Sequence, residues 1–293
     1  MKYGCLYSYY GTEWGADLYG YLKILEKFNR CGCQVLEIGA GDVLGMTVEE
    51  LETLRDAAKL YEMEITLNIG PPKDKDIASR DEAVRRAGVE FLISIIRRMK
   101  YLSAKTFIGA MYSYWPCDFT DTDKEGNWDR SVASMKEIAA VAEEEGVTLC
   151  MEILNRFESY LVNDCEEGLR YISDVGSPNV KLLIDTFHAN IEEDDVVKSF
   201  YLAGDKLGHV HVGEANRKLP GMGSGIPWPE IGKALRDIGY DGCVVMEPFL
   251  LKGGAVGRDV KVFRDLSQNA DEAKMSQYLT EAVRFLKHHF EAV

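Results

Sequence analysis

Four ionisable residues stand near the ends of four successive predicted strands: Glu152 in CMEIL, Asp185 in LLIDT, His211 in HVHVG and Glu247 in VVMEP. Taken singly, each carboxylate could cap the following helix or pair with a base. An unpaired charge within an apolar run is costly, however, and three neighbouring anions repel one another unless a cation lies between them. Three carboxylates and one imidazole suit Mn²⁺, Co²⁺ or Mg²⁺ better than a structural zinc. The set therefore predicts a divalent metal site.

A metal held in this way would bind two vicinal oxygens of a sugar and act as a Lewis acid. It would stabilise the enediolate that forms when a neighbouring C–H loses its proton. Glu152 and Glu247 flank the set, so they are the predicted acid/base pair. Removal of a proton from one face of a carbon and delivery to the other face is epimerisation.

Other polar residues near these strand ends receive different predictions. His209 shares a face with His211, because side chains alternate with period two along a strand, but it lies one layer deeper. It is therefore predicted to be a hydrogen-bonded interior histidine. His188 follows Asp185 by three residues, beyond the strand, and together with Arg217 it is predicted to hold sugar hydroxyls.

Eight short β-rich runs alternate with helical patterns along the whole chain. The runs cover residues 2–8, 34–40, 64–70, 106–112, 148–154, 180–186, 207–213 and 242–248. This order predicts a single (β/α)8 barrel domain over residues 1–293, in which the active site lies at the carboxyl ends of the strands. The alternative is an open doubly wound sheet, but the first turn, SYYGTEWGAD, lacks the expected G-x-G-x-x-G.

Several helix ends can be placed from local signals. Thr47 with Glu50, and Ser79 with Glu82, have the spacing of a capping box at a helix start. Gly146 follows VAEEE and suits a left-handed position just past a helix end. The last helix is predicted over residues 271–291.

Composition argues against some partners. The net charge is −14 and the pI is near 4.9, which disfavours binding to nucleic acid or to an anionic membrane.

We find no signal peptide before the first strand and no apolar run long enough to span a membrane. The seven cysteines are odd in number and scattered, and the pair at 31 and 33 lacks zinc-knuckle spacing, so a reducing cytoplasm is expected.

Aromatic residues are dense in the predicted loops that follow the strands, as is common in sugar sites; they include Trp14, Trp115 and Phe249. The segment GMGSGIP at 221–227 lacks the Lys-Ser/Thr of a phosphate-binding loop and is predicted to be a mobile loop. A free sugar is therefore the expected substrate.

The sequence resembles the ketose 3-epimerase family of D-tagatose and D-psicose 3-epimerases. The likeness runs over nearly the whole chain and includes SYYGTEW, NIGPPK, YSYWP, MEILNRFE, IDTFHANIEED, GHVHVGEANRKLPG, IPWPEIGKALRDIGYDG, MEPF and KVFRDLS. The resemblance implies C3 epimerisation of free ketohexoses, D-fructose and D-psicose above all, through a cis-enediolate. D-Tagatose, D-sorbose and ketopentoses are further candidate substrates.

The resemblance also implies roles for individual residues. It implies that one Mn²⁺ or Co²⁺ ion is held by Glu152, Asp185, His211 and Glu247, of which the two glutamates are also catalytic. The implied substrate-binding residues are Glu158, His188, Arg217, Trp115 and Phe249, and Leu6 and Trp14 are further predicted substrate-binding residues. The family further implies a homodimer or a homotetramer.

Two features depart from the family pattern. Leu6 stands where the family commonly carries a Tyr that lines the far end of the sugar site, and the loop at 221–227 is one residue longer than usual. Both bear on which ketose is preferred.

Two other functions compete with ketose 3-epimerisation. One keeps the barrel and the metal but catalyses aldose–ketose isomerisation or sugar-phosphate epimerisation. The other is a non-catalytic sugar-binding or metal-binding barrel. The pair Glu152 and Glu247 argues against a pure binder, which has no use for opposed bases.

Overall fold

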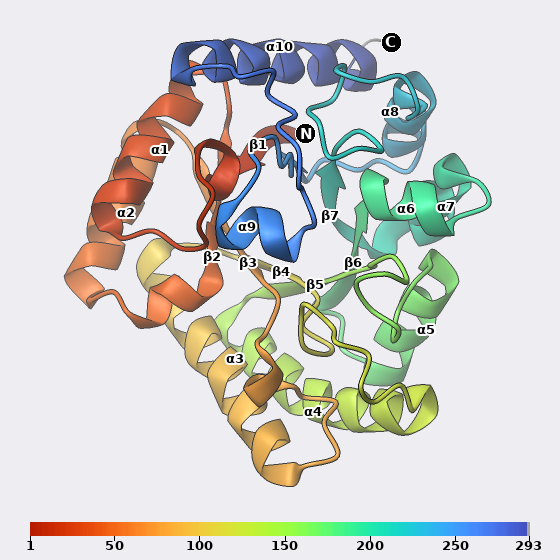
Figure 1. Cartoon of the computed structure of the whole chain (residues 1–293). Helices are drawn as coiled ribbons and strands as arrows, with labels where there is room; N and C mark the ends of the chain where they lie inside the picture. The colour runs from red at the N-terminus through yellow and green to blue at the C-terminus, as the bar shows by residue number, and fades with distance from the viewer. Residues whose placement is uncertain (292–293) are drawn as a thin grey trace.

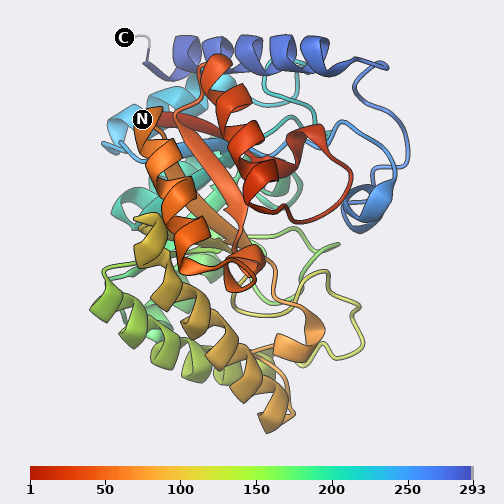
Figure 2. The ribbon, with the colours of Figure 1, turned by 90° about the vertical axis from the view of Figure 1, so that its left-hand side faces the viewer.

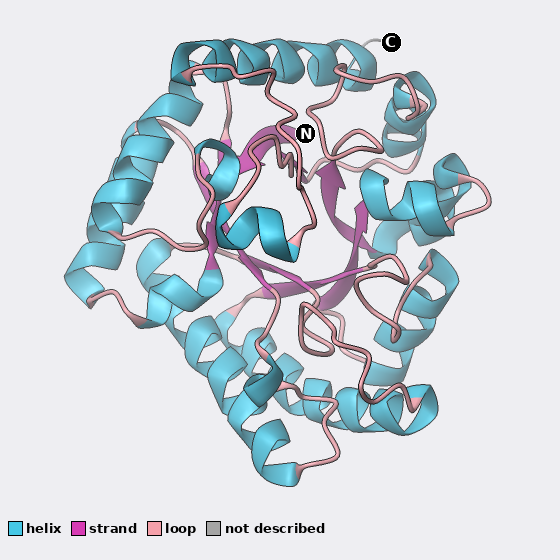
Figure 3. Cartoon of the chain, viewed as in Figure 1, coloured by secondary structure: helices cyan, strands magenta, loops and turns pink. Residues whose placement is uncertain are grey.

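Eight parallel strands close into a barrel in the computed structural model, which describes residues 1–291. Each strand pairs with the next along the chain, and the last pairs with the first (Figure 3). The strands are β1 (Lys2–Leu6), β2 (Val35–Gly39), β3 (Glu64–Ile69), β4 (Thr106–Gly109), β5 (Thr148–Glu152), β6 (Val180–Asp185), β7 (Leu207–Val212) and β8 (Cys243–Met246). The predicted closed barrel is confirmed. Residues 292–293 of the predicted domain lie outside the described part of the chain.

Helices surround this ring of strands, as Figures 1 and 2 show. They are α1 (Leu18–Arg30), α2 (Val48–Leu60), α3 (Glu82–Leu102), α4 (Lys124–Glu145), α5 (Cys165–Val175), α6 (Thr186–Glu192), α7 (Val196–Ala203), α8 (Trp228–Asp237), α9 (Gly254–Asp259) and α10 (Glu272–Glu291), with short 3₁₀ helices η1 (Tyr7–Tyr10), η2 (Ala40–Leu44), η3 (Lys73–Lys75) and η4 (Gly204–Lys206). Helix α9 lies in front of the ring in Figure 1, where residues 259 and 260 line the central cavity.

The predicted capping boxes and the predicted glycine at a helix end are right at two of three positions, and the last helix, α10, begins one residue later than predicted. Thr47 and Glu50 form the capping box of α2, and Gly146 ends α4 with a left-handed φ of 64°. The predicted box of Ser79 with Glu82 is wrong. Helix α3 begins at Glu82 itself, and the carboxylate of Asp81 caps it by accepting a 2.8 Å hydrogen bond from the backbone N–H of residue 83.

The interior of the barrel changes from apolar to charged toward the carboxyl ends of the strands. Because side chains alternate along a strand, residues of one parity face inward. Two small buried clusters fill the lower layers: Val35, Cys243 and Val245, and Ile108, Cys150 and Leu183. Two residues further along the same strands come Glu37, Glu152, Asp185 and Glu247, with His211 on β7. The alternation therefore directs these ionisable groups into one buried layer.

Gly109 allows strands β3 and β4 to approach closely at this end of the barrel. It has a φ of +125°, and a Cβ atom there would lie 2.0 Å from the carbonyl oxygen of Ile69. We predict that Gly109→Ala lowers the free energy of unfolding by about 2–5 kcal/mol, because it adds both backbone strain and a clash. Urea unfolding followed by circular dichroism measures this change.

Gly45→Ala is the matched control for that variant. Gly45 has a φ of −83°, and the nearest atom to an added Cβ lies 3.5 Å away. The control should change stability by less than about 1 kcal/mol. If Gly109→Ala were as stable as the wild type, β3 and β4 could not approach each other at this position as closely as described.

Candidate active site

Four buried side chains from four adjacent strands meet at the carboxyl end of the barrel. Each of Glu152, Asp185, His211 and Glu247 offers one ligand atom, and these atoms all lie within 4.8 Å of one another. Asp185 pairs with His211 in the strand register, and Glu247 follows β8 directly. None of the four side chains is more than slightly exposed. The structure thus brings together the predicted metal-binding residues, whose role remains a prediction.

The orientation of His211 suits a metal ligand. Its Nε2 atom lies 2.9 Å from Glu37 Oε1, so Nδ1 faces the other way, 3.3 Å from Glu152 Oε1 and 3.8 Å from Glu247 Oε1. Among residues 1–291, no group makes a hydrogen bond to this buried Nδ1 atom. A buried nitrogen with no partner, placed among three carboxylates, fits a divalent cation.

Charge repulsion is strong in this cluster. Burial raises the pKa of Glu247 to about 8, an increase that the neighbouring Glu152 carboxylate reinforces and His211 opposes. Burial disfavours a proton on His211, but the carboxylates of Glu37, Glu247 and Glu152 outweigh it and raise the pKa of the imidazole well above its usual range. A bound cation would replace these protons and remove the repulsion.

Arg217 supplies positive charge from the loop after β7. Its Nη1 atom lies 3.2 Å from Asp185 Oδ2 and 2.9 Å from Glu247 Oε2, while its Nη2 atom lies 3.4 Å from Glu158 Oε1. The guanidinium also stacks on the ring of Phe187, with its Cζ 3.7 Å from the ring centroid. Arg217 is therefore fixed at the edge of the carboxylate cluster, where it also lines the cavity.

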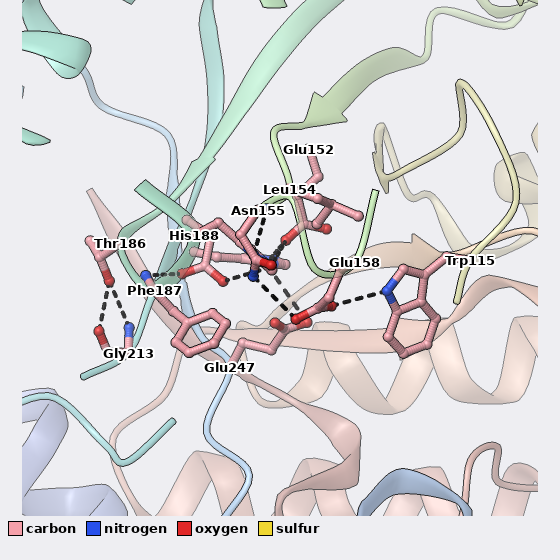
Figure 4. Close-up of polar contacts among 12 residues, drawn as sticks. Trp115, Glu152, Leu154, Asn155, Glu158, Thr186, Phe187, His188, Gly213 and Glu247 are labelled. Carbon is pink, nitrogen blue, oxygen red and sulfur yellow. Dashed lines mark hydrogen bonds and ion pairs between the residues drawn. The ribbon is translucent and has the colours of Figure 1, made fainter. Parts of the chain in front are cut away.

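His188 presents a hydrogen-bond donor to the carboxylate cluster (Figure 4). Its Nδ1 atom accepts a 3.1 Å hydrogen bond from the backbone N–H of Asn155, and the side-chain amide of Asn155 lies 2.7 Å from the same atom. The ring proton must therefore sit on Nε2, which lies 3.9 Å from Glu152 Oε1 and 3.8 Å from Asp185 Oδ2. His188 can donate this proton in a hydrogen bond to an oxygen of a bound molecule.

A cavity of about 450 Å³ opens above these groups. All seven predicted substrate-binding residues line it: Leu6, Trp14, Trp115, Glu158, His188, Arg217 and Phe249. Asp185 and His211 lie behind the cavity wall, while Glu152 and Glu247 reach the cavity itself. The aromatic rings form one wall, because Trp14 contacts both Trp115 and Phe249 edge-on. The size and mixed lining of the cavity suit a small polar molecule.

Glu158 joins the aromatic wall to the charged floor. Its Oε2 atom accepts a 3.0 Å hydrogen bond from Trp115 Nε1 (Figure 4). Burial alone would raise the pKa of the Glu158 carboxyl, but His188 and Arg217 lower it below its usual range. Glu158 is therefore an anionic acceptor at the edge of the cavity.

The loop at 221–227 does not line the cavity within residues 1–291. It is attached to the barrel through Glu214, whose Oε1 atom accepts hydrogen bonds from the backbone N–H of Gly221 and from Trp228 Nε1. Any effect of its extra length on substrate choice must therefore be indirect. Leu6, in contrast, lies in the cavity wall.

Three residues at or near the site were not predicted from the sequence. Glu37 and Asn68 contact the predicted metal-binding cluster from β2 and β3, and Asp259 accepts a 2.9 Å hydrogen bond from Trp14 Nε1. Glu37 had a detectable signal, because it is a carboxylate inside the apolar run VLEIG. His209 is fully buried as predicted, and its Nε2 atom lies 3.1 Å from Glu37 Oε2, although this contact falls outside strict hydrogen-bond geometry.

Known proteins have a similar fold and a similar sequence. Residues 25–266 match the family described as the xylose isomerase-like TIM barrel. The chain is 43% identical to a D-psicose 3-epimerase of Ruminiclostridium cellulolyticum, with 99% of this chain and 98% of that protein covered, and 44% identical to one of Agrobacterium fabrum, with 97% and 98% covered. A crystal structure of D-psicose 3-epimerase with D-tagatose from Clostridium cellulolyticum H10 superposes with a TM-score of 0.96, at 43% identity and 99% coverage of both chains. The chain therefore belongs to the ketose 3-epimerase family, as its motifs indicated.

Proposed function

We propose that the protein is an isomerase that inverts C3 of free ketohexoses and interconverts D-fructose and D-psicose. The observation that carries this proposal is the pair of buried carboxylates at the cavity floor, Glu152 from β5 and Glu247 after β8. Their ligand atoms lie within 4.8 Å of each other, and both are close to His211 Nδ1, at 3.3 Å for Glu152 and 3.8 Å for Glu247. Inversion requires one base on each face of the same carbon, and two separate carboxylates at the cavity floor support this assignment.

We propose that Glu152, Asp185, His211 and Glu247 hold one divalent ion per subunit, Mn²⁺ or Co²⁺, with Mg²⁺ as a further candidate. The oxygen-rich donor set and the free Nδ1 atom of His211 support this assignment. When bound, such an ion is a Lewis acid that acidifies the C–H beside a substrate carbonyl. A carboxylate that is also a metal ligand can then act as the base.

In the proposed mechanism, one of Glu152 and Glu247 removes the C3 proton and the other returns a proton to the opposite face. The roles would exchange in the reverse reaction, because in this proposal each carboxylate serves one face of the same carbon. His188 donates its Nε2 proton in a hydrogen bond to a sugar oxygen, and Arg217 donates to another. The aromatic wall of Trp14, Trp115 and Phe249 excludes water from the reacting carbon.

The residues that line the cavity bear on the choice of substrate. The apolar Leu6 offers no hydrogen bond to the far end of a sugar, so we propose that D-tagatose, D-sorbose or ketopentoses are also accepted. The competing sugar-phosphate epimerase would need a cationic pocket for the phosphate. No lysine lines the cavity in the described part of the chain, and its one arginine already contacts three carboxylates.

We propose a cytoplasmic homodimer or homotetramer that has no nucleic-acid or membrane partner. All seven cysteines are free, as suits a reducing compartment. No helix within residues 1–291 is long and apolar enough to cross a membrane. Phe157, Ile191 and Phe263 are exposed apolar residues, and the first two line a groove beside the cavity that is suited to subunit contact.

The reaction can be tested in D₂O with Mn²⁺-loaded protein and D-fructose. We expect D-psicose to form with deuterium at C3, because the proton that the second carboxylate delivers comes from a group in exchange with solvent. Nuclear magnetic resonance of the recovered sugars locates the label. Deuterium at C1 together with an aldose product would instead establish the competing isomerase.

Glu247→Gln tests the acid/base pair. It should lower kcat by about 10²–10⁴-fold, because the amide cannot accept the proton, and it should also weaken Mn²⁺ binding. Steady-state kinetics and metal titration measure the two effects. Glu214→Gln is the matched control, since it changes another buried carboxylate, one that does not line the cavity, and keeps the Oε1 acceptor. Full activity of Glu247→Gln would remove this residue from the mechanism.

Comparison of D-fructose with D-fructose 6-phosphate tests the substrate class. We expect kcat/KM for the phosphate ester to be lower by at least about tenfold, because its dianion would enter a cavity without a free cation. A higher kcat/KM for the phosphate ester would favour the sugar-phosphate epimerase.

A further inference from the structure

We infer that Glu37 is a positioning residue that fixes the orientation and the protonated nitrogen of His211 and, through Asn68, the position of Glu247. This inference rests on the proposed metal centre and adds to it a residue that is not itself a ligand. Glu37 is on β2, across the barrel from the strand that carries His211, and it is fully buried.

Both oxygens of Glu37 are engaged. Oε1 lies 2.9 Å from His211 Nε2 and accepts a 3.1 Å hydrogen bond from Asn68 Nδ2. Oε2 accepts a 2.9 Å hydrogen bond from the hydroxyl of Thr66. Because both oxygens accept hydrogen bonds from fixed donors, Glu37 is held as a carboxylate in one orientation.

The carboxylate determines which nitrogen of His211 is free. A carboxylate can only accept a hydrogen bond, so the Nε2 atom of His211 must carry a proton. The lone pair available for a cation is then on Nδ1, the atom that faces Glu152 and Glu247. Histidines that bind metals commonly donate their other N–H to a carboxylate in this way, which fixes the ring and makes it a better ligand.

Asn68 extends the effect to the proposed catalytic pair. Its Nδ2 atom donates to Glu37 Oε1 and also lies 3.5 Å from Glu247 Oε1. One amide group thus connects the buried carboxylate with a proposed ligand and base. Loss of the Glu37 charge would therefore disturb His211 directly and Glu247 through Asn68.

Glu37, His209 and His211 are also close enough together to be considered as a second metal site. The donors already bound to Glu37 argue against it, because Thr66 and Asn68 use acceptor positions that a cation would need. A cation there would also have to displace the Nε2 proton of His211. We therefore favour the positioning role. The number of metal ions bound per subunit distinguishes this role from a second metal site.

Glu37→Gln tests the inference, because it keeps the shape and removes the charge. We expect the Mn²⁺ dissociation constant, measured by competition with a chelator, to rise by about 10–100-fold while one ion per subunit still binds. In the Mg²⁺-loaded wild type, ¹⁵N spectra of the imidazoles should show a slowly exchanging proton on His211 Nε2. This signal should shift or broaden in Glu37→Gln.

Two control variants separate positioning from simple loss of stability. Leu92→Ala removes a buried side chain from α3, away from the cavity, and should lower the melting temperature without changing the Mn²⁺ dissociation constant. Thr66→Val removes a hydrogen bond to Oε2 but leaves the contact of Oε1 with His211, so its effect on metal affinity should be much smaller.

The possible outcomes are distinct. Wild-type metal affinity in Glu37→Gln, or a ring proton on Nδ1 of His211 in the Mg²⁺-loaded wild type, would overturn the inference and leave the proposed metal centre intact. Two ions bound per wild-type subunit, with one lost in Glu37→Gln, would overturn it in favour of a second metal site. If the wild type binds no divalent ion, the proposed metal centre and this inference both fail. The spectrum of the wild type decides the matter even if Glu37→Gln does not fold.

Discussion

The repulsion among buried carboxylates at one end of the barrel is the constraint on which the site depends. Glu152, Asp185 and Glu247 are all removed from water within a few ångströms of one another. Such a layer is stable only with compensating positive charge, which His211 and Arg217 supply in part. The apolar layers below it, built from residues such as Cys150 and Val245, hold the strands that impose this proximity. A divalent cation would satisfy the same constraint and add Lewis acidity.

Much of the barrel and of its charged layer could be predicted from the sequence, because both follow from local patterns. Eight apolar runs separated by helices indicate the barrel, and a carboxylate inside such a run, as in LLIDT, marks a buried charge. The period of two along β7 is enough to place His209 directly below His211. Helix starts were less certain, since α3 is capped by Asp81 although Ser79 and Glu82 have capping-box spacing.

The contacts that cross the barrel could not be predicted in this way. Glu37 and His211 are 174 residues apart, and their meeting depends on closure and tilt of the whole sheet rather than on any local spacing. The contact of Trp14 with Asp259 joins the loop before α1 to the last residue of α9, 245 residues away, and depends on how both segments fold. The family resemblance pointed to the residues predicted to bind the substrate, but the side chains that contact them became known only from the structure.

The most direct test of the account is anomalous diffraction from crystals of the protein grown with Mn²⁺. The account predicts one strong anomalous peak per subunit, coordinated by Glu152, Asp185, Glu247 and the Nδ1 atom of His211, with Glu37 still bonded to Nε2. A peak elsewhere, coordination through Nε2, or no peak among the four side chains at saturating Mn²⁺ would contradict it.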